Sequence, residues 1–107
     1  MMIVPRAVQP LALLIHELCV NAVSHGSLSQ PSGRIMIRWD FAVDRNSFVL
    51  NWREIGGRPP TAIRRRGFGT LIADAIVRRQ LNGAVAREWL QEGLKVTVDV
   101  PNAIAWD

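Results

Sequence analysis

Residues 16–26 read HELCVNAVSHG and carry two polar side chains, Glu17 and Asn21, four residues apart in a mostly apolar stretch. Apolar residues recur at helical spacing from residue 9 to about residue 25, so the sequence predicts a helix there. On a helix with about 3.6 residues per turn, Glu17, Asn21 and Ser24 fall within an arc of about 60° at the edge of the apolar stripe. A carboxylate there can act on a proton or a water, and an amide oxygen can ligate Mg²⁺. The same spacing also fits ordinary surface residues of a helix.

The rest of the chain predicts two hairpins and a second helix. The expected elements are strands 34–41 and 47–52, a helix from residue 68 that ends at Asn82-Gly83, and strands 85–89 and 94–100. This order predicts an α/β (α+β) two-layer sandwich, with the helices packed on one antiparallel or mixed sheet. We expect Trp39, Trp89 and Cys19 to pack in its core.

Composition limits the class of protein. The 107 residues, 49% of them hydrophobic, predict one domain over 1–107 that buries roughly two-thirds of its unfolded surface. No signal peptide or long uncharged apolar run is evident, which predicts a cytoplasmic protein without a membrane segment. The lone Cys19 excludes an internal disulfide and a cysteine-based zinc site. A net charge of +4 favours phosphate-bearing partners. Nucleic-acid binding is not indicated, because the sequence predicts no basic helix interleaved with aromatic residues.

A glycine-rich loop separates the first hairpin from the second helix. Residues 54–69 read EIGGRPPTAIRRRGFG, with glycines at 56, 57, 67 and 69. Glycine lets the backbone approach a ligand, and the amides at a helix N-terminus favour an anion such as phosphate. Just before the loop, Glu54 ends a strand, where its carboxylate can accept a hydrogen bond from an exocyclic amine of a purine. Glycines also serve ordinary turns, and a glutamate at a strand end is often simply solvated.

Three motifs together resemble a known family. HELCVNAVSHGSLS (16–29) resembles the asparagine box of the GHKL ATPase superfamily, and NWREIGG (51–57) and RRGFGT (65–70) resemble its two glycine boxes. The histidine in the first motif and the Trp-x-Glu in the second resemble the HWE subfamily of bacterial sensor histidine kinases. The resemblance extends from about residue 8 to residue 101. It implies a Bergerat-type ATP-binding fold that is shortened at its N-terminus.

The resemblance also implies roles for individual residues. Asn21 would hold the Mg²⁺ that bridges the ATP phosphates, Glu17 would be the catalytic base or polariser, and Glu54 would face the adenine amine. The other residues implied in nucleotide binding are Ser24, His25, Gly56, Gly57, Arg66, Gly67, Gly69 and Thr70. The run that ends in Arg66 would reach the phosphates from a lid or would be a solvated face. His16 is expected to have a structural role.

The sequence departs from the family at two places. Ser24 and His25 stand where family members commonly have a lysine and an aromatic residue, which removes a positive charge near the phosphates. The histidine-bearing dimerisation domain, and the strand and helix that usually precede the asparagine box, are not found upstream. We therefore expect an exposed sheet edge, which favours a homodimer, and no phosphoacceptor histidine in the chain.

Three functions follow as hypotheses. The first is the ATP-binding catalytic domain of a sensor histidine kinase, with Mg²⁺ and ATP as cofactors and with a separate dimerisation domain and a response regulator as partners. The second is a degenerate, non-catalytic GHKL module that docks a response regulator or another signalling protein. The third, a serine kinase of the anti-sigma type, is disfavoured by the Trp-x-Glu signature.

Overall fold

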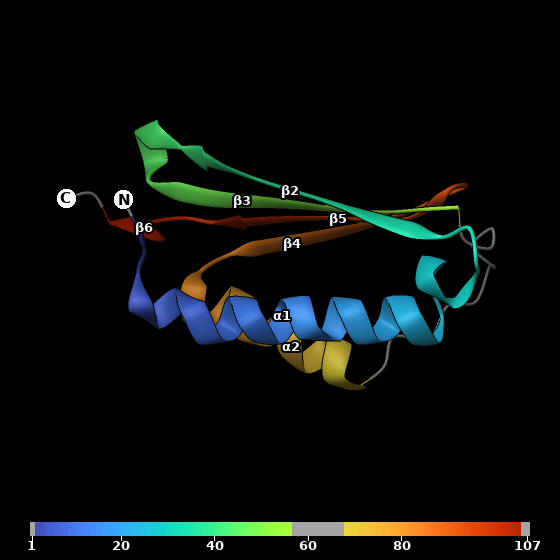
Figure 1. Ribbon diagram of the computed structural model, residues 1–107. Coiled ribbons are helices and arrows are strands. Elements are labelled where there is room, and N and C mark those ends of the chain that lie inside the picture. The colour runs from blue at the N-terminus through green and yellow to red at the C-terminus, as the bar shows by residue number, and fades with distance from the viewer. Residues whose placement is uncertain (1, 57–67, 106–107) are drawn as a thin grey trace.

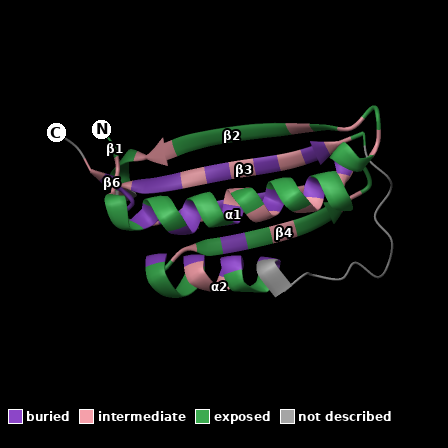
Figure 2. Cartoon of the chain, turned by 60° about the horizontal axis from the view of Figure 1, so that its bottom comes forward, coloured by how far each residue is buried: buried purple, intermediate pink, exposed green. Residues whose placement is uncertain are grey.

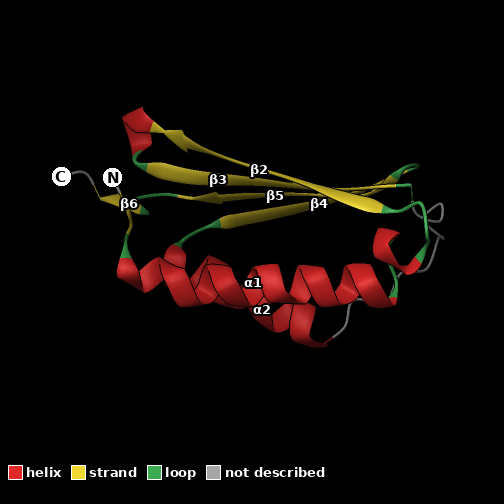
Figure 3. Ribbon diagram, viewed as in Figure 1, coloured by secondary structure: helices red, strands yellow, loops and turns green. Residues whose placement is uncertain are grey.

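The computed structural model describes residues 2–56 and 68–105, and within them the chain forms two layers (Figures 1 and 3). One layer holds the helices α1 (Pro5–Ser24) and α2 (Phe68–Leu81), which pack side by side. The other is an antiparallel sheet with the strand order β2-β3-β5-β4. Its strands are β2 (Arg34–Ala42), β3 (Ser47–Ile55), β4 (Ala84–Leu90) and β5 (Gly93–Val100). The expected α+β sandwich is confirmed.

Short elements complete the described chain. Strands β1 (Met2–Ile3) and β6 (Ile104–Ala105) pair next to the two chain ends, and the sequence pattern did not predict them. The 3-10 turns are η1 (Ser27–Ser29), after α1, and η2 (Val43–Arg45), in the first hairpin. Asn46 closes that hairpin at φ 49°, a left-handed conformation that asparagine tolerates better than most residues.

Helix α1 begins four residues before the predicted start. Pro5 is its first residue, a position where the missing N–H of proline costs no helical hydrogen bond. The helix ends at Ser24, and the N–H groups of His25 and Gly26 both donate to the carbonyl oxygen of Asn21. The predicted end of α2 is confirmed, because Asn82 adopts φ 52° and Gly83 N–H donates to the carbonyl of Val77.

The core lies between α1 and the centre of the sheet. Leu11, Leu14, Leu18 and Ala22 of α1 are buried against β3 and β5, as the helical spacing predicts. The register aligns helix-facing side chains of the four strands in rows, one made of Ile37, Trp52, Val96 and Arg87 and the next of Trp39, Leu50, Val98 and Val85. In both rows the members on β3 and β5 are at most 1% exposed.

The edge strands are covered less than the pattern predicted. Trp39 on β2 is 63% exposed and Trp89 on β4 is 43% exposed, so the expectation that both tryptophans pack in the core is wrong. Figure 2 shows the reason for Trp39, because the helices lie along β3 and β4 and leave β2 beyond their reach. Alternation in a strand identifies a face, but only the position of the strand in the sheet decides whether that face is covered.

The outward side of α1 is also apolar, and Cys19 lies on it, exposed rather than in the core as expected. With this second apolar side, the segment Pro5–Ser29 is long and apolar enough to cross a membrane by length and composition alone. The sequence pattern predicted no membrane segment. A buried core helix meets the same criteria, and Leu11, Leu14 and Leu18 pack against the sheet.

Candidate functional site

Two of the predicted site residues meet across 49 positions of sequence. Asn21, in the last turn of α1, donates its Nδ2–H to the hydroxyl oxygen of Thr70, in the first turn of α2, at 2.7 Å. Thr70 is buried and Asn21 is half-buried, so the bond lies at the edge of the core, as the helical arc predicted for Asn21. The stretches that resemble the asparagine box and the second glycine box therefore meet at one end of the helical layer.

The orientation of the Asn21 amide matters for chemistry. Its nitrogen is engaged by Thr70, so its Oδ1 oxygen is the atom that remains to accept a hydrogen bond or to ligate a cation. Glu17 is half-buried one turn earlier on α1. Gly69 and Thr70 lie in the first turn of α2, whose first amides have no helical acceptor and can bind an anion. At this end of the helical layer, α1 thus supplies the oxygen ligands and α2 supplies the amides that have no helical acceptor.

Ser24 and His25 lie just beyond Asn21 and are exposed. His25 is the C-terminal cap of α1, and its N–H donates to the Asn21 carbonyl at 2.8 Å. His16 is also exposed, two turns from the end of the helix, on the outward side of α1. Neither histidine side chain lies in the core.

Glu54 lies on β3 in a different setting from the solvated strand end that the sequence also allowed. It is only 3% exposed, its Oε2 accepts the Trp52 indole N–H at 3.0 Å, and its Oε1 accepts the backbone N–H of Ser27 at 3.0 Å. Hydrogen bonds to a charged group are worth about 1.5–3 kcal/mol each. The tryptophan and glutamate of the Trp-x-Glu motif therefore tie β3 to the turn that follows α1.

Two glycines are required by this packing. A Cβ on Gly26 would overlap Oε1 of Glu54, and a Cβ on Gly56 would lie 2.6 Å from the carbonyl oxygen of Ser32. Gly56 also has φ 77°, in the left-handed region that favours glycine. The sequence predicts that Gly56 lets the backbone approach a ligand, whereas the close approach that the structure shows at Gly56 is to the η1–β2 connection. Gly57, Arg66 and Gly67 lie outside the described residues.

A buried ion pair behind Thr70 was missed by sequence reasoning. Asp74, one turn after Thr70 on α2, accepts from Arg87 of β4 through both carboxylate oxygens, at 2.9 and 3.2 Å. The two side chains are 3% and 5% exposed. The available signal was Arg87 on the predicted inner face of a strand, a position that requires a buried partner. The pair joins α2 to the sheet and so sets the position of Thr70.

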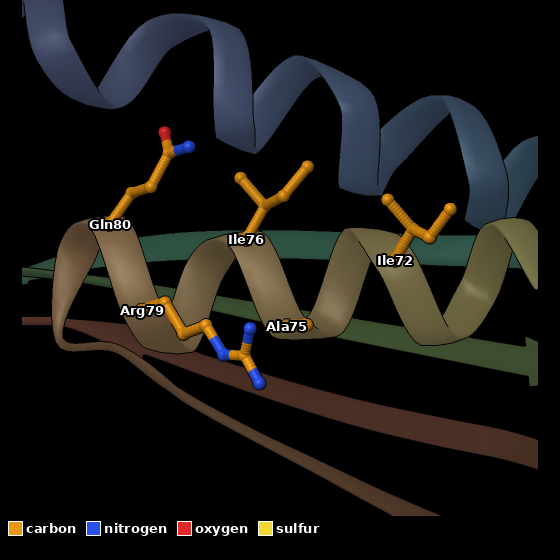
Figure 4. Close-up of a pocket in the computed structure, with 5 residues that line it drawn as sticks. All are labelled: Ile72, Ala75, Ile76, Arg79 and Gln80. Atoms are coloured by element: carbon orange, nitrogen blue, oxygen red, sulfur yellow. The ribbon is translucent and has the colours of Figure 1, made fainter.

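The described residues also line a depression of about 320 Å³ along α2, formed by Ile72, Ala75, Ile76, Arg79 and Gln80. In Figure 4, Ile72, Ile76 and Gln80 point toward α1, whereas Ala75 and Arg79 point away from it. The depression is mostly apolar and contains none of the predicted site residues. We therefore place the candidate site at the helix ends around Asn21 and Thr70.

The donor set fits a magnesium nucleotide. The described residues contain no cluster of three or more His, Cys, Asp or Glu side chains. Mg²⁺ needs none, because it is usually bound through one or two protein oxygens together with substrate phosphates and water. The Asn21 amide oxygen and the Glu17 carboxylate are hard oxygen donors of that kind.

Comparison with known proteins identifies relatives among histidine kinases, although no family model matches the chain. A blue-light-activated histidine kinase of Rhizobium johnstonii is 43% identical over 96 residues, 90% of this chain and 28% of the relative. Blue-light-activated histidine kinase 1 of Erythrobacter litoralis is 34% identical over 102 residues, 91% of this chain and 27% of the relative. The chain thus spans about a quarter of the length of these relatives.

A solved structure has the same fold. The histidine kinase domain of a blue-light-activated histidine kinase from Erythrobacter litoralis superposes with a TM-score of 0.75 at 19% identity. The match covers 90% of this chain and 48% of that one. The chain is therefore homologous to a segment of bacterial histidine kinases and has a fold found in a histidine kinase domain.

Proposed function

We propose that the chain is the ATP-binding catalytic part of a sensor histidine kinase of the HWE type within the GHKL superfamily. It would bind Mg-ATP at the end of the helical layer around Asn21 and Thr70. The terminal phosphoryl group would pass to an imidazole nitrogen of a histidine on a separate dimerisation domain and leave ADP. A response regulator would then receive the phosphoryl group, and the chain would work in the cytoplasm.

The hydrogen bond between Asn21 and Thr70 carries this proposal. It joins Asn21, in the motif expected to hold the metal, to Thr70, in the motif expected to hold the phosphates. The distance from Asn21 Nδ2 to Thr70 Oγ1 is 2.7 Å. A purely structural contact would explain the bond, but not the combination of the bond with a helix N-terminus and a glutamate one turn away. Homology to histidine kinases supports the same function.

In the proposed site, Asn21 Oδ1 would ligate Mg²⁺, and the amides of Gly69 and Thr70 would donate to phosphate oxygens. Glu17 would polarise the attacking imidazole. The bound Mg²⁺ would neutralise charge on the phosphates, as is general in phosphoryl transfer. The residues of the chain would mainly position the phosphates and exclude water.

Glu54 is the proposed acceptor of the adenine amine. Each of its carboxylate oxygens already accepts one hydrogen bond, and each has a second lone pair for another donor. Gly57, Arg66 and Gly67 remain proposed contributors from the loop.

The proposal is tested by calorimetric titration of the purified chain with a non-hydrolysable ATP analogue, with and without Mg²⁺. We expect saturable, magnesium-dependent binding that Asn21→Ala abolishes. Asn51→Ala is the matched control, because Asn51 is a half-buried asparagine on β3 whose amide oxygen accepts from Thr97. Absence of binding up to millimolar analogue, from a chain shown to be folded, would refute the nucleotide site.

The second candidate is the non-catalytic docking module. Ser24 and His25 favour it, because both are exposed at the site and neither supplies the lysine charge that the family commonly has there. Labelled ATP, the chain and a dimerisation domain added in trans discriminate the two functions. Transfer of label to the added histidine supports the kinase, and nucleotide binding without transfer counts against it. Binding of Mg-ATP that depends on Asn21 counts against the docking module.

A further inference from the structure

Trp89 is a partly exposed tryptophan on the side of the sheet that faces the helices. It lies on β4 and is 43% exposed, although its partner on β5, Leu94, is buried. Arg87, two residues before it, points to the helical layer, because its guanidinium pairs with Asp74 of α2. Alternate residues of a strand share a face, so the indole of Trp89 is also directed to the helices.

Two contacts between α2 and β4 show how the helix and the strand are aligned. Arg78 of α2 donates to the carbonyl oxygen of Val85. One turn earlier on the helix, Asp74 accepts from Arg87, which lies two residues later on the strand. The two elements therefore run antiparallel. A step of four residues on the helix, about 6 Å, matches a step of two residues on the strand, about 6.6 Å.

The next such step places Trp89 at the first turn of α2. Thr70 lies one turn before Asp74 on the helix. Trp89 lies two residues after Arg87 on the strand, so Thr70 and Trp89 are at the same level. Thr70 also accepts the hydrogen bond from Asn21. Trp89 therefore lies at the end of the helical layer that carries the candidate site.

The register of the sheet relates Trp89 to Glu54. Arg53 of β3 pairs with Lys95 of β5, so the next residue of β3, Glu54, lies beside Leu94. Leu94 in turn pairs with Trp89. Because neighbouring strands are about 4.8 Å apart, the backbones of Glu54 and Trp89 are about 10 Å apart across the sheet. One row on the inner face thus carries a carboxylate and an aromatic ring.

We propose that Trp89 is a binding residue of the nucleotide site and that its indole stacks on the purine base. This role rests on the function proposed above, in which the phosphates lie at the first turn of α2 and the adenine amine meets Glu54. Stacking needs only the flat face of a base, whereas the contact with Glu54 needs an exocyclic amine. Trp89 would therefore add affinity for the base, and Glu54 would select among bases.

A second exposed tryptophan provides a matched control. Trp39 of β2 is on the same side of the sheet and is 63% exposed. Its partner on β3, Leu50, precedes Glu54 by four residues, which is about 13 Å along the strand. Trp39 is thus an exposed indole on the helix-facing side that lies far from the row of Glu54 and Trp89.

Calorimetric titration of the purified chain with the magnesium complex of a non-hydrolysable ATP analogue tests this role. We expect Trp89→Leu to weaken binding by roughly tenfold or more, because stacking of a base on an aromatic side chain is lost. Trp89→Phe keeps an aromatic ring and should lose less affinity. Trp39→Leu should bind the analogue as the unaltered chain does.

Tryptophan fluorescence gives a second measurement, which does not depend on the folding of Trp89→Leu. A purine stacked on the indole should quench the emission of the unaltered chain as the analogue saturates the site. Most of this quenching should be absent in Trp89→Phe and retained in Trp39→Phe.

The possible failures are distinguishable. Equal affinity in Trp89→Leu and the unaltered chain, both shown to be folded by circular dichroism, would overturn the role of Trp89 and leave the nucleotide site in place. Quenching that persists in Trp89→Phe would overturn the same role. An unaltered, folded chain that binds no analogue would refute the nucleotide site itself and the role of Trp89 with it.

Discussion

The indole nitrogen of Trp52 and the carboxylate of Glu54 lie 3.0 Å apart in the core, on the same side of β3. Both side chains are almost fully buried, at 1% and 3% exposure. Since the other oxygen of Glu54 accepts the N–H of Ser27, this pair fixes the turn after α1 and with it the end of the helix that carries Asn21. The pair therefore has a measurable structural role that is independent of any ligand.

Replacing Trp52 by phenylalanine should lower the free energy of unfolding by about 2–4 kcal/mol. The change removes the indole donor from a buried carboxylate and leaves a cavity. Urea unfolding followed by circular dichroism measures the loss. Trp39→Phe is the control, because Trp39 is exposed and the same change there should cost the monomer well under about 1 kcal/mol. Equal costs at the two positions would contradict the structural role of the Trp52–Glu54 bond.

Gly26→Ala should destabilise the protein strongly, since the added Cβ would overlap Oε1 of Glu54. The carboxylate would have to leave its hydrogen bonds, at a cost of about 1–3 kcal/mol. A thermal unfolding scan measures the shift. The double variant Gly26→Ala with Glu54→Ala should unfold at a temperature close to that of Glu54→Ala alone. A full additional loss in the double variant would show that Gly26 is required for another reason.

Thr70→Val should weaken binding of Mg-ATP, because the valine cannot accept from Asn21 and frees the amide to rotate. A net hydrogen bond of about 1 kcal/mol corresponds to roughly a five- to tenfold loss of affinity. Thr70→Ser keeps the hydroxyl and should retain most of the affinity. Calorimetry measures the affinity of both variants for Mg-ATP. Equal affinity in Thr70→Val and Thr70→Ser would mean that the Thr70 hydroxyl does not contribute to nucleotide binding.

Arg87→Met should destabilise the fold by about 3–5 kcal/mol, because Asp74 would remain buried without its partner. The double variant Arg87→Met with Asp74→Leu should regain much of that stability, since apolar side chains can replace a buried ion pair. Urea unfolding of the three proteins tests both statements. A double variant no more stable than Arg87→Met would mean that the site accepts no apolar pair.

Ser24→Lys should raise the affinity for Mg-ATP, because it restores a positive charge at the exposed end of α1 beside the proposed phosphate site. The gain should shrink as salt is added, since exposed charges are screened. Gln80→Lys adds the same charge at the exposed far end of α2 and should leave affinity nearly unchanged. An equal gain in both variants would indicate a general effect of net charge.

The order of elements followed from local patterns in the sequence. Helical spacing of Leu11, Leu14 and Leu18 predicted α1 and its buried side, and alternation predicted all four strands of the main sheet. The arc of Glu17, Asn21 and Ser24 predicted polar groups at the edge of the core, where Glu17 and Asn21 are half-buried, whereas Ser24 is exposed. These features depend on neighbours within one or two turns, so the sequence carried them without further information.

Contacts between distant segments were decided by the tertiary structure. Three contacts join elements whose separation depends on how the helices and the sheet pack. They are the Asn21–Thr70 hydrogen bond, the hydrogen bond from Ser27 N–H to Glu54, and the Asp74–Arg87 ion pair. The exposure of Trp39 is the clearest case, because its position in the pattern matches that of buried Leu50, its partner on β3. Periodicity selects the face of a strand, but only packing decides which part of that face the helices cover.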